Sequence, residues 1–267
     1  MTPTENNSSR PGPAAPVSGA AADLLSLTRT LGDPDRDLVI LAEGNTSVRT
    51  QDGRMLVKAS GSMMGSAEEG DFVEVDTAAL LSVLDGPELD EHRLGEALMG
   101  ARVNGGPRPS IEAMLHALCI EEAGASVVGH THPVAANALL CSDQASVLVD
   151  GALFPDQVVV LGAQSVLVPY ADPGRPLALA TREALRRHLE THGVAPKVVW
   201  LANHGLFALG ESAREVLQVT EMAVKLARIA TGVLSVGRPT FLPQRSVDVL
   251  DKRPDEVLRR QKLAGKA

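Results

Sequence analysis

The sequence contains the stretch Ala125-Ser126-Val127-Val128-Gly129-His130-Thr131-His132-Pro133. Its short apolar run is typical of a buried strand, and the two histidines follow at the point where that strand should end. Successive side chains of an extended segment point to opposite faces, so His130 and His132 should point to the same face. The stretch therefore predicts a strand that offers two imidazoles to one metal ion.

Candidates for the remaining ligands stand at the edges of two other apolar runs. Glu112 ends the stretch Arg108-Pro109-Ser110-Ile111-Glu112, and His204 lies within Leu201-Ala202-Asn203-His204-Gly205. Three imidazoles and one carboxylate suit zinc, although another divalent metal could use the same set, and the carboxylate could leave the metal to act as a base. Each histidine alone is explained by a hydrogen-bonded polar group at the end of an element, so this prediction depends on the whole set.

The composition indicates one domain of the α/β class. A chain of 267 residues can bury one sizeable core, and an aromatic content of 2% means that Leu, Val, Ala and Ile must build it. The net charge of −8 and the isoelectric point near 5.4 argue against nucleic acid and against anionic membranes as partners. A small molecule is the expected ligand.

The two cysteines and the two ends of the chain indicate a cytoplasmic protein. Cys119 and Cys141 both fall within apolar helical patterns, which fits buried, reduced thiols better than a disulfide. Residues 1–18 are rich in Pro, Ser, Asn and Gly and predict a disordered tail without signal-peptide character. We expect the folded domain to span residues 19–238, a charged, partly ordered tail to span 239–267, and no segment to cross a membrane.

Periodicity predicts helices and strands that alternate in short pieces. Helices are expected over residues 21–31, 77–84 (with Asp76 as its cap), 110–123, 133–140, 177–191 and 212–229. Strands are expected over residues 38–41, 55–58, 72–76, 125–129, 147–149, 158–161, 166–170, 197–201 and 206–209, with a hairpin turn at 51–54. Residues 86–106 should be an exposed polar stretch, and His92, His188 and His192 should be solvated. Hairpins flanked by helices predict a layered α/β sandwich around a mainly antiparallel sheet.

A loop of small residues follows the strand that ends at Lys58. It reads Ala59-Ser60-Gly61-Ser62-Met63-Met64-Gly65. Exposed backbone N–H groups, hydroxyls and the Lys58 ammonium could hold an anion there. A plain turn explains the same composition, so both interpretations stay open.

Six blocks of the sequence, in the same order, resemble the class II aldolase/adducin family of zinc-dependent sugar-phosphate aldolases, which includes fuculose-phosphate and rhamnulose-phosphate aldolases. The blocks are Glu43-Gly44-Asn45-Thr46-Ser47-Val48-Arg49, Lys58-Ala59-Ser60-Gly61, Pro109-Ser110-Ile111-Glu112 with His116, Gly129-His130-Thr131-His132-Pro133, Pro169-Tyr170 and Asn203-His204-Gly205. The resemblance covers about residues 21–236. It implies the layered fold of this family.

The resemblance also implies roles for individual residues. His130, His132 and His204 match the zinc ligands, and Glu112 matches the acid/base residue, which also approaches the metal when substrate is absent. His116 is expected to support these ligands or to be a hydrogen-bonded core residue. The positions that hold the substrate's phosphate in the family are matched by Gly44, Asn45, Ser60, Gly61 and Ser110.

The activity implied by the resemblance is retro-aldol cleavage of a ketose, expected to be a ketose 1-phosphate, to dihydroxyacetone phosphate and an aldehyde. A 4-epimerase, a decarboxylase of a 3-oxo-acid phosphate and a non-enzymatic adducin-like binding module are the alternatives. Family members are commonly cyclic homotetramers with sites between subunits, so a homotetramer is expected here.

Two departures from the family pattern concern the substrate. Ile111 stands where a second serine often helps to bind phosphate, and Lys58 could compensate with its charge, or the substrate could lack phosphate. Phe154 stands where fuculose-phosphate-type enzymes have the tyrosine that protonates the aldehyde oxygen. Tyr170 is the only tyrosine, and it could supply this proton or simply anchor its loop.

Overall fold

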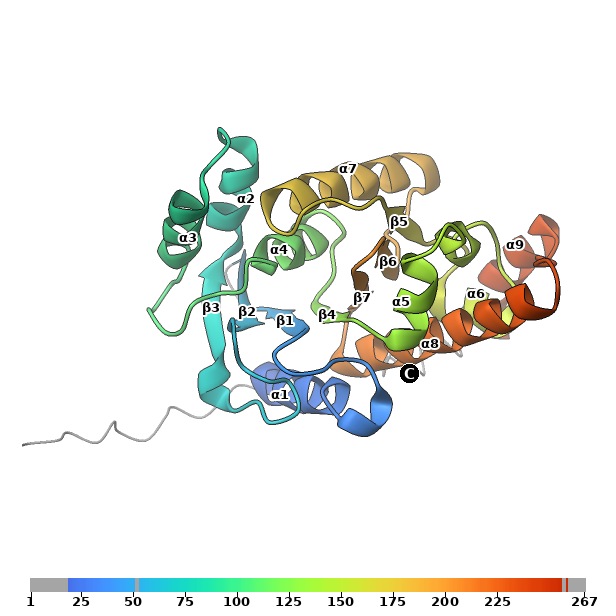
Figure 1. The fold of residues 1–267 in the computed structure, drawn as a ribbon, viewed down its shortest axis with the longest axis horizontal. Coiled ribbons are helices and arrows are strands. Elements are labelled where there is room, and N and C mark those ends of the chain that lie inside the picture. The colour runs from blue at the N-terminus through green and yellow to red at the C-terminus, as the bar shows by residue number, and fades with distance from the viewer. Residues whose placement is uncertain (1–18, 51–52, 256–257, 259–267) are drawn as a thin grey trace, which may run out of the picture.

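The protein is described by a computed structural model that covers residues 19–50, 53–255 and 258. A seven-stranded sheet with the strand order β3-β2-β1-β4-β7-β6-β5 forms its centre (Figure 1). The strands are β1 (Asn45–Arg49), β2 (Arg54–Lys58), β3 (Phe72–Asp76), β4 (Val127–Thr131), β5 (Val166–Val168), β6 (Val198–Leu201) and β7 (Gly205–Gly210). All neighbours pair antiparallel except β5 and β6. The predicted mainly antiparallel sheet is confirmed.

Helices cover both faces of this sheet, as Figure 1 shows. In the described residues they are α1 (Gly19–Leu31), α2 (Thr77–Asp85), α3 (Glu91–Gly100), α4 (Ala113–Glu121), α5 (Val134–Leu140), α6 (Pro155–Leu161), α7 (Arg175–His192), α8 (Ala213–Val236) and α9 (Gln244–Lys252). One apolar core lies under α2, α3, α4 and α7, and a second lies under α1, α5, α6 and α8. The layered α/β sandwich expected from the sequence is therefore present.

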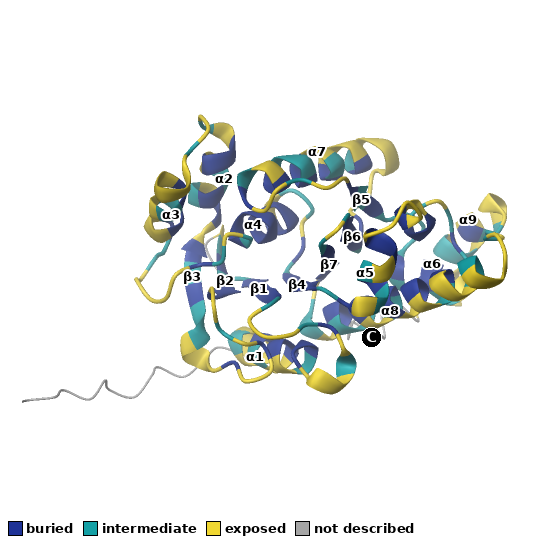
Figure 2. Cartoon of the chain, in the orientation of Figure 1, coloured by how far each residue is buried: buried dark blue, intermediate teal, exposed yellow. Residues whose placement is uncertain are grey.

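The alternation of side chains along each strand divides the residues between these two cores. Val127 belongs to the core under α1 and α8, whereas Val128 belongs to the core under α4. Leu206 and Phe207 of β7 divide in the same way. His130 has the same parity as Val128, so its side chain faces α4. Buried residues line the interior of the fold in Figure 2.

Two predicted helix caps are present. The backbone N–H of Ala79 donates to Asp76 Oδ1 at 3.0 Å, and that of Glu215 donates to Ser212 Oγ at 3.2 Å. Each bond satisfies an N–H group that the first helical turn would leave unpaired. The helix that Ser212 caps, α8, continues to Val236 and is longer than expected.

Two predicted strands are helices, and both errors have the same cause. Residues 147–149 fall at the end of a 3-10 helix (Ala145–Leu148), and residues 158–161 fall within α6. Pro155 occupies the first turn of α6, where its fixed φ and missing N–H are tolerated. A short buried helix shows a continuous apolar run like that of a buried strand, because its exposed face is narrow.

Two other segments also differ from expectation. Residues 38–41 form an irregular loop, in which Leu41 has a left-handed φ of 52° and is exposed. The stretch 86–106 was expected to be polar and exposed, but it contains α3, whose Leu94 and Leu98 are buried. The sequence pattern did not indicate this helix, because charged residues dominate it and only one narrow apolar stripe faces the core.

Individual side chains correct two more expectations. Cys119 is buried, as predicted, but Cys141 is exposed because it follows the last residue of α5. His188 is buried in α7 instead of solvated, since it falls on the face of this amphipathic helix that packs against the fold. His92 is exposed, as expected.

The ends of the chain are described only in part. The predicted tail 1–18 and Gln51 and Asp52 of the predicted hairpin turn lie outside the described residues. The predicted tail 239–267 contains α9, whose Val247 is buried and packs in a small cluster with Val158 of α6. Among the described helices, none combines the length and the apolar character needed to cross a membrane.

Candidate metal centre

The sheet topology brings three histidines together at one end of the central strands. Thr131, the last residue of β4, pairs with Leu206 of β7, and Leu201, the last residue of β6, pairs with Gly205. The ends of β4 and β6 therefore meet the start of β7. His130 and His132 lie at the end of β4, and His204 lies in the turn between β6 and β7, so strand pairing alone places them together.

Glu112 approaches these histidines from the start of α4. Its Oε1 lies 3.2 Å from His130 Nε2 and 3.0 Å from His204 Nε2. The Nε2 atoms of His130 and His132 are 2.9 Å apart. One ligand atom from each of the four residues lies within 4.8 Å of the others, which makes them a potential metal-binding cluster.

Hydrogen bonds away from the cluster orient the imidazole of His130. Its Nδ1 lies 2.9 Å from the carbonyl oxygen of Leu206, which can only accept, so Nδ1 carries the proton. The lone pair is therefore on Nε2, the atom that faces the cluster. Phe207 stacks on this ring, with centroids 4.2 Å apart and planes inclined by 16°, and holds it in place.

A carboxylate lies near the ring nitrogen of His132 that points away from the cluster. Its Nδ1 lies 3.6 Å from Glu43 Oε2, and its backbone N–H donates to the carbonyl of Leu38 at 2.8 Å. A carboxylate on the far nitrogen favours the tautomer whose lone pair faces a metal. The sequence pattern predicts no role for Glu43, although this residue opens the first motif block. Its contact with His132 forms only when the loop is folded.

A tight turn fixes His204. Asn203 has a left-handed φ of 57°, and a Cβ atom at Gly205 would lie 2.5 Å from the carbonyl oxygen of Thr131. Position 205 therefore requires glycine. The side chain of Asn137 in α5 donates to the carbonyl of His204 at 2.9 Å. The sequence Asn203-His204-Gly205 is thus a turn that aims one imidazole at the cluster.

The protonation states of the cluster suit a cation. Burial raises the pKa of Glu112, but the neighbouring His130 and His204 outweigh it and hold that pKa well below the usual range. Burial, aided by His130 and His204, lowers the pKa of His132 to about 3. An ionised Glu112 and a neutral His132 are the forms in which these two side chains bind metal.

Two of the residues expected to bind phosphate lie against Glu112. Asn45 Nδ2 is 2.7 Å from Glu112 Oε2 and 3.4 Å from Ser110 Oγ. Ser110 Oγ also accepts the N–H of Glu112 at 3.3 Å, and α4 begins three residues later, at Ala113. Gly44 precedes this group with a φ of 68°, and a Cβ there would lie 2.8 Å from the carbonyl oxygen of His130.

The small-residue loop lies beside the same segment. Ala59 forms a bridge with Pro109, and the N–H of Ser60 donates to the carbonyl of Arg108 at 2.9 Å, which brings the Ser60-Gly61 turn next to Ser110. Lys58 itself is buried, and its ammonium donates to the carbonyl oxygens of Ala59 and Ser62. Burial lowers its pKa, whereas Asp71 and Glu112 raise it. The cation therefore lies under the loop.

Tyr170 stands apart from the four clustered residues. Its side chain is exposed, and its hydroxyl is 3.0 Å from Asp172 Oδ1. This contact with the next turn favours the loop-anchoring interpretation within the single chain.

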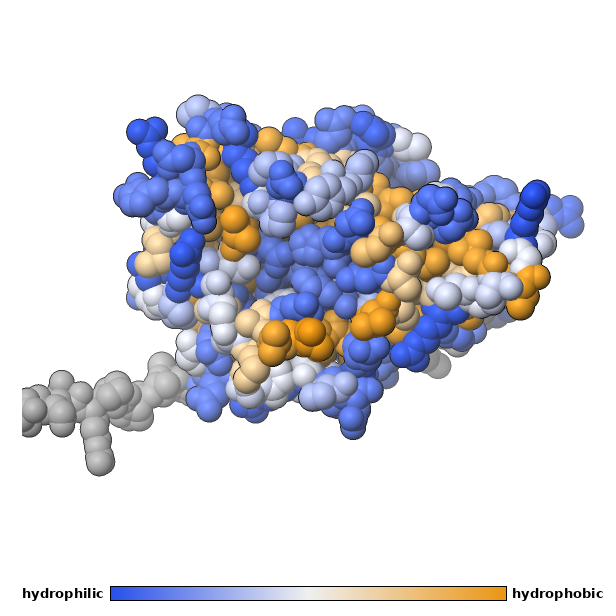
Figure 3. Space-filling model, in the orientation of Figure 1, coloured by the Kyte–Doolittle hydropathy of each residue, from blue (hydrophilic) through white to orange (hydrophobic). Residues whose placement is uncertain are grey.

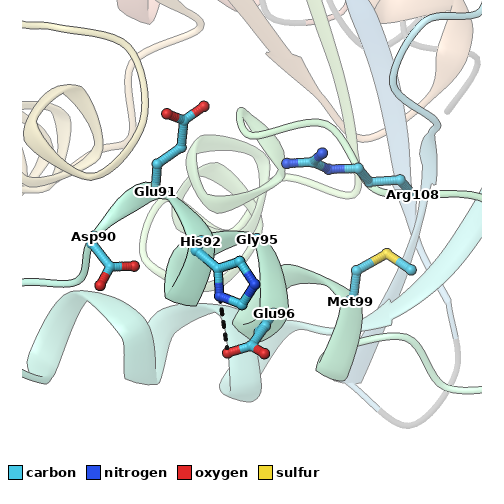
Figure 4. Close-up of a pocket in the computed structure, with 7 residues that line it drawn as sticks. All are labelled: Asp90, Glu91, His92, Gly95, Glu96, Met99 and Arg108. Carbon is cyan, nitrogen blue, oxygen red and sulfur yellow. Dashed lines mark ion pairs between the residues drawn. The ribbon is translucent and has the colours of Figure 1, made fainter.

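A pocket beside α3 does not include the cluster (Figure 4). Residues of α3 line it together with Arg108, and its His92 makes an ion-pair contact with Glu96, 3.7 Å away. None of the four clustered residues contributes to its lining. The face shown in Figure 3 has a separate hydrophilic hollow at its centre, with apolar atoms along part of its rim.

Comparison with known families decides which group of proteins shares this arrangement. The model described as the class II aldolase and adducin N-terminal domain matches residues 22–231. The chain belongs to the class II aldolase/adducin family. The matched region begins in α1 and ends in α8, so it includes every member of the cluster.

Solved structures of other proteins share the fold at low sequence identity. An L-fuculose 1-phosphate aldolase is 21% identical with a TM-score of 0.67, covering 89% of this chain and 97% of the other. YgbL of Klebsiella pneumoniae, titled a putative aldolase/epimerase/decarboxylase, is 21% identical with a TM-score of 0.66, covering 86% and 97%. These likenesses establish the fold alone.

Two curated relatives are each 26% identical. The 3-oxo-tetronate 4-phosphate decarboxylase of Haemophilus influenzae aligns over 73% of this chain and 80% of its own length. The uncharacterized oxidoreductase YuxG of Bacillus subtilis aligns over 78% of this chain, but the match spans only 29% of that longer protein. The names of these relatives therefore point to more than one activity.

Proposed function

We propose that this protein is a metal-dependent lyase that cleaves a ketose, in the first place a ketose 1-phosphate, by a retro-aldol reaction to dihydroxyacetone phosphate and an aldehyde. The observation that carries the proposal is the convergence of Glu112 with His130, His132 and His204. The similarity to an L-fuculose 1-phosphate aldolase supports it.

The donor set fits a divalent metal, and zinc is the metal we propose. His130 presents the lone pair of Nε2, and the ionised Glu112 adds an oxygen ligand. When bound, the metal would act as a Lewis acid that stabilises negative charge on the substrate's carbonyl oxygen. Glu112 would also transfer a proton, because its carboxylate lies next to His130 and His204.

The proposed reaction removes one proton from the C4 hydroxyl and adds one proton to C3. Cleavage of the C3–C4 bond leaves its electron pair on C3, while the C4 hydroxyl would give its proton to the ionised Glu112 as it becomes the aldehyde. Glu112 would deliver a proton to C3, and in the synthetic direction it would remove that proton. Gly44, Asn45, Ser60, Gly61 and Ser110 would hold the phosphate, with the buried Lys58 adding positive charge from beneath the loop.

Decarboxylation of a 3-oxo-acid phosphate is the second candidate. The relative from Haemophilus influenzae, which aligns over most of its length, favours it. Loss of carbon dioxide also leaves an electron pair beside a carbonyl group, and the same carboxylate could protonate that carbon. This reaction creates no aldehyde, so it needs no tyrosine in place of Phe154.

We also propose that the protein is a cytoplasmic homotetramer. Exposed apolar side chains of Ile40, Leu41 and Met63 line one groove on the chain, and such a surface suits burial against another subunit. The free thiol of Cys141, which is exposed, suits a reducing compartment.

A substrate panel tests the function. Metal-loaded protein would be incubated with ketose 1-phosphates and with a 3-oxo-acid phosphate, and aldehyde and carbon dioxide would be measured separately. We expect aldehyde from at least one ketose phosphate and none from chelator-treated protein. Carbon dioxide alone would establish the second candidate, and an epimer without fragments would identify an epimerase. Protein that binds no stoichiometric metal would point to a binding module.

A further inference from the structure

The two carboxylate oxygens of Glu112 have different partners. Oε1 faces His130 and His204, at 3.2 Å and 3.0 Å. Oε2 accepts a hydrogen bond from Asn45 Nδ2 at 2.7 Å. One oxygen is therefore directed at the potential metal site, while the other is tied to β1.

Behind Asn45 stands a fully buried histidine. Asn45 Oδ1 contacts His116 Nε2, and His116 Nδ1 lies 2.7 Å from Ser47 Oγ. Asn45 and Ser47 are two residues apart on β1 and thus face the same side, and β1 is paired with β4 so that Asn45 lies opposite His130. Phe207 packs edge-on against His116, with ring centroids 5.1 Å apart.

The chemistry of the groups sets the direction of these bonds. An ionised carboxylate can only accept, so the Asn45 atom that faces Glu112 must be the amide nitrogen. Asn45 Oδ1 then accepts from Nε2–H of His116. The other ring nitrogen, Nδ1, has no proton and accepts from the hydroxyl of Ser47. All three bonds donate toward Glu112, and a chain of this kind strengthens its terminal bond.

We propose that Ser47, His116 and Asn45 form a positioning relay that holds Glu112 Oε2 and thereby directs Oε1 to the metal. Ser47 and His116 are positioning residues, since they act only through Asn45 and Glu112. The second amide hydrogen of Asn45 faces Ser110 Oγ, 3.4 Å away, so the relay also connects Glu112 to the proposed phosphate site. The inference rests on the proposed function, in which Glu112 is the acid/base group, but measurements of metal binding can test it without any activity assay.

The main variant is His116→Leu, which removes both ring nitrogens and keeps an apolar volume. The matched variant His116→Gln keeps an amide N–H that can reach Asn45. Leu118→Ala is the control, because Leu118 is also fully buried in α4 but belongs to the apolar core. Each protein would be loaded with Co²⁺, and its visible spectrum and its Co²⁺ affinity would be measured by competition with a chromophoric chelator.

We expect His116→Leu to weaken Co²⁺ binding by about 10-fold and to change the visible spectrum, as expected when a supporting bond behind a ligand is lost. His116→Gln should stay within about 3-fold of the unmodified protein. Leu118→Ala should lose thermal stability with an unchanged spectrum.

A folded His116→Leu protein with the affinity and spectrum of the unmodified protein, or with changes no larger than those of Leu118→Ala, would overturn the relay. If His116→Leu fails to fold, Ser47→Ala decides, with an expected loss of about 3-fold, and no change in affinity overturns the proposal. Failure of the unmodified protein to cleave any substrate would contradict the proposed function. The Co²⁺ affinities and spectra would still test the relay in that case.

Discussion

The helices α4 and α7 pack on the same face of the sheet, and each buries a histidine, but the two histidines have different surroundings. In α4, both ring nitrogens of His116 have hydrogen-bond partners that continue to Glu112. In α7, Nε2 of His188 is buried and has no hydrogen-bond partner among the described residues, and the ring of His192 lies next to it with centroids 4.6 Å apart. Burial alone therefore does not connect a histidine to the cluster, whereas the hydrogen bonds of His116 do connect it to Glu112.

The helices also differ in how they meet solvent. Every residue of α4 from Ala113 to Ile120 is buried, so polar groups on these residues can face only the interior. Helix α7 is amphipathic, and its outer face carries ion pairs such as Arg187 with Glu183. Changes at His116 in α4 should therefore alter metal binding and catalysis, whereas changes in α7 should alter only stability.

The largest expected effect comes from removing the charge at the start of α4. Glu112→Gln should lower kcat by about 1,000-fold, because an acid/base group contributes on this scale, while the three histidines still retain metal. Steady-state kinetics together with metal analysis would measure it. Glu183→Gln in α7 is the matched control, with unchanged turnover expected. Equal turnover in both variants would remove Glu112 from the mechanism.

Metal removal should distinguish the four-residue cluster from α7 by its effect on stability. Metal present at 100 times its Kd stabilises a folded protein by about 2.7 kcal/mol, so a chelator should lower Tm by about 5–10 °C. His188→Leu in α7 should show the same decrease, whereas His204→Ala should show almost none. Differential scanning calorimetry with and without chelator measures both. A normal chelator effect in His204→Ala would contradict the assignment of this ligand.

The contact between the two helices offers a test of substrate specificity. Ile111, just before α4, lies so close to Gly174 at the start of α7 that a Cβ there would be 2.9 Å from Ile111 Cδ1. Ile111→Ser restores a hydroxyl beside Ser110 and should lower KM for a phosphorylated ketose by about 5-fold, the effect of one hydrogen bond. The KM for the unphosphorylated sugar should not change. An equal change for both substrates would show that no phosphate lies there.

The smallest effect should be a pH dependence that arises in α7. Burial, aided by His192, lowers the pKa of His188 to about 4, whereas an unfolded histidine titrates near 6.5. Between these values the unfolded chain binds more protons, so the free energy of unfolding falls as the pH decreases from about 6.5 to about 4. His188→Leu should reduce this loss, which is measured as the difference in Tm between pH 7 and pH 5. An unchanged difference would show that His188 does not contribute.

The ligand set was predictable because its residues stand at the ends of apolar runs. The ends of β4 and β6 both lie beside the start of β7, because each of these strands pairs antiparallel with β7, and this pairing brings His130 and His204 together. The capped helices α2 and α8 were predictable for a similarly local reason, since an Asp or Ser before an apolar period satisfies the first N–H groups.

Short apolar segments and contacts across the fold were beyond the sequence pattern. The run at 158–161 is a helix because α8 and α9 cover it, and the loop at 38–41 lies where it does because His132 bonds to Leu38. The contact of Glu43 with His132 likewise forms only after folding.

By itself, the sequence determined the family, through six short motif blocks that resemble it. It also determined the mainly antiparallel sandwich and the four side chains that can meet a metal, because periodicity, caps and turn residues act over a few neighbouring positions. Only the tertiary structure decided that Asn45 and His116 stand behind Glu112, that Lys58 lies under its loop and that His188 is buried. Such contacts join residues that are distant in the chain, and their geometry depends on how helices and strands pack together.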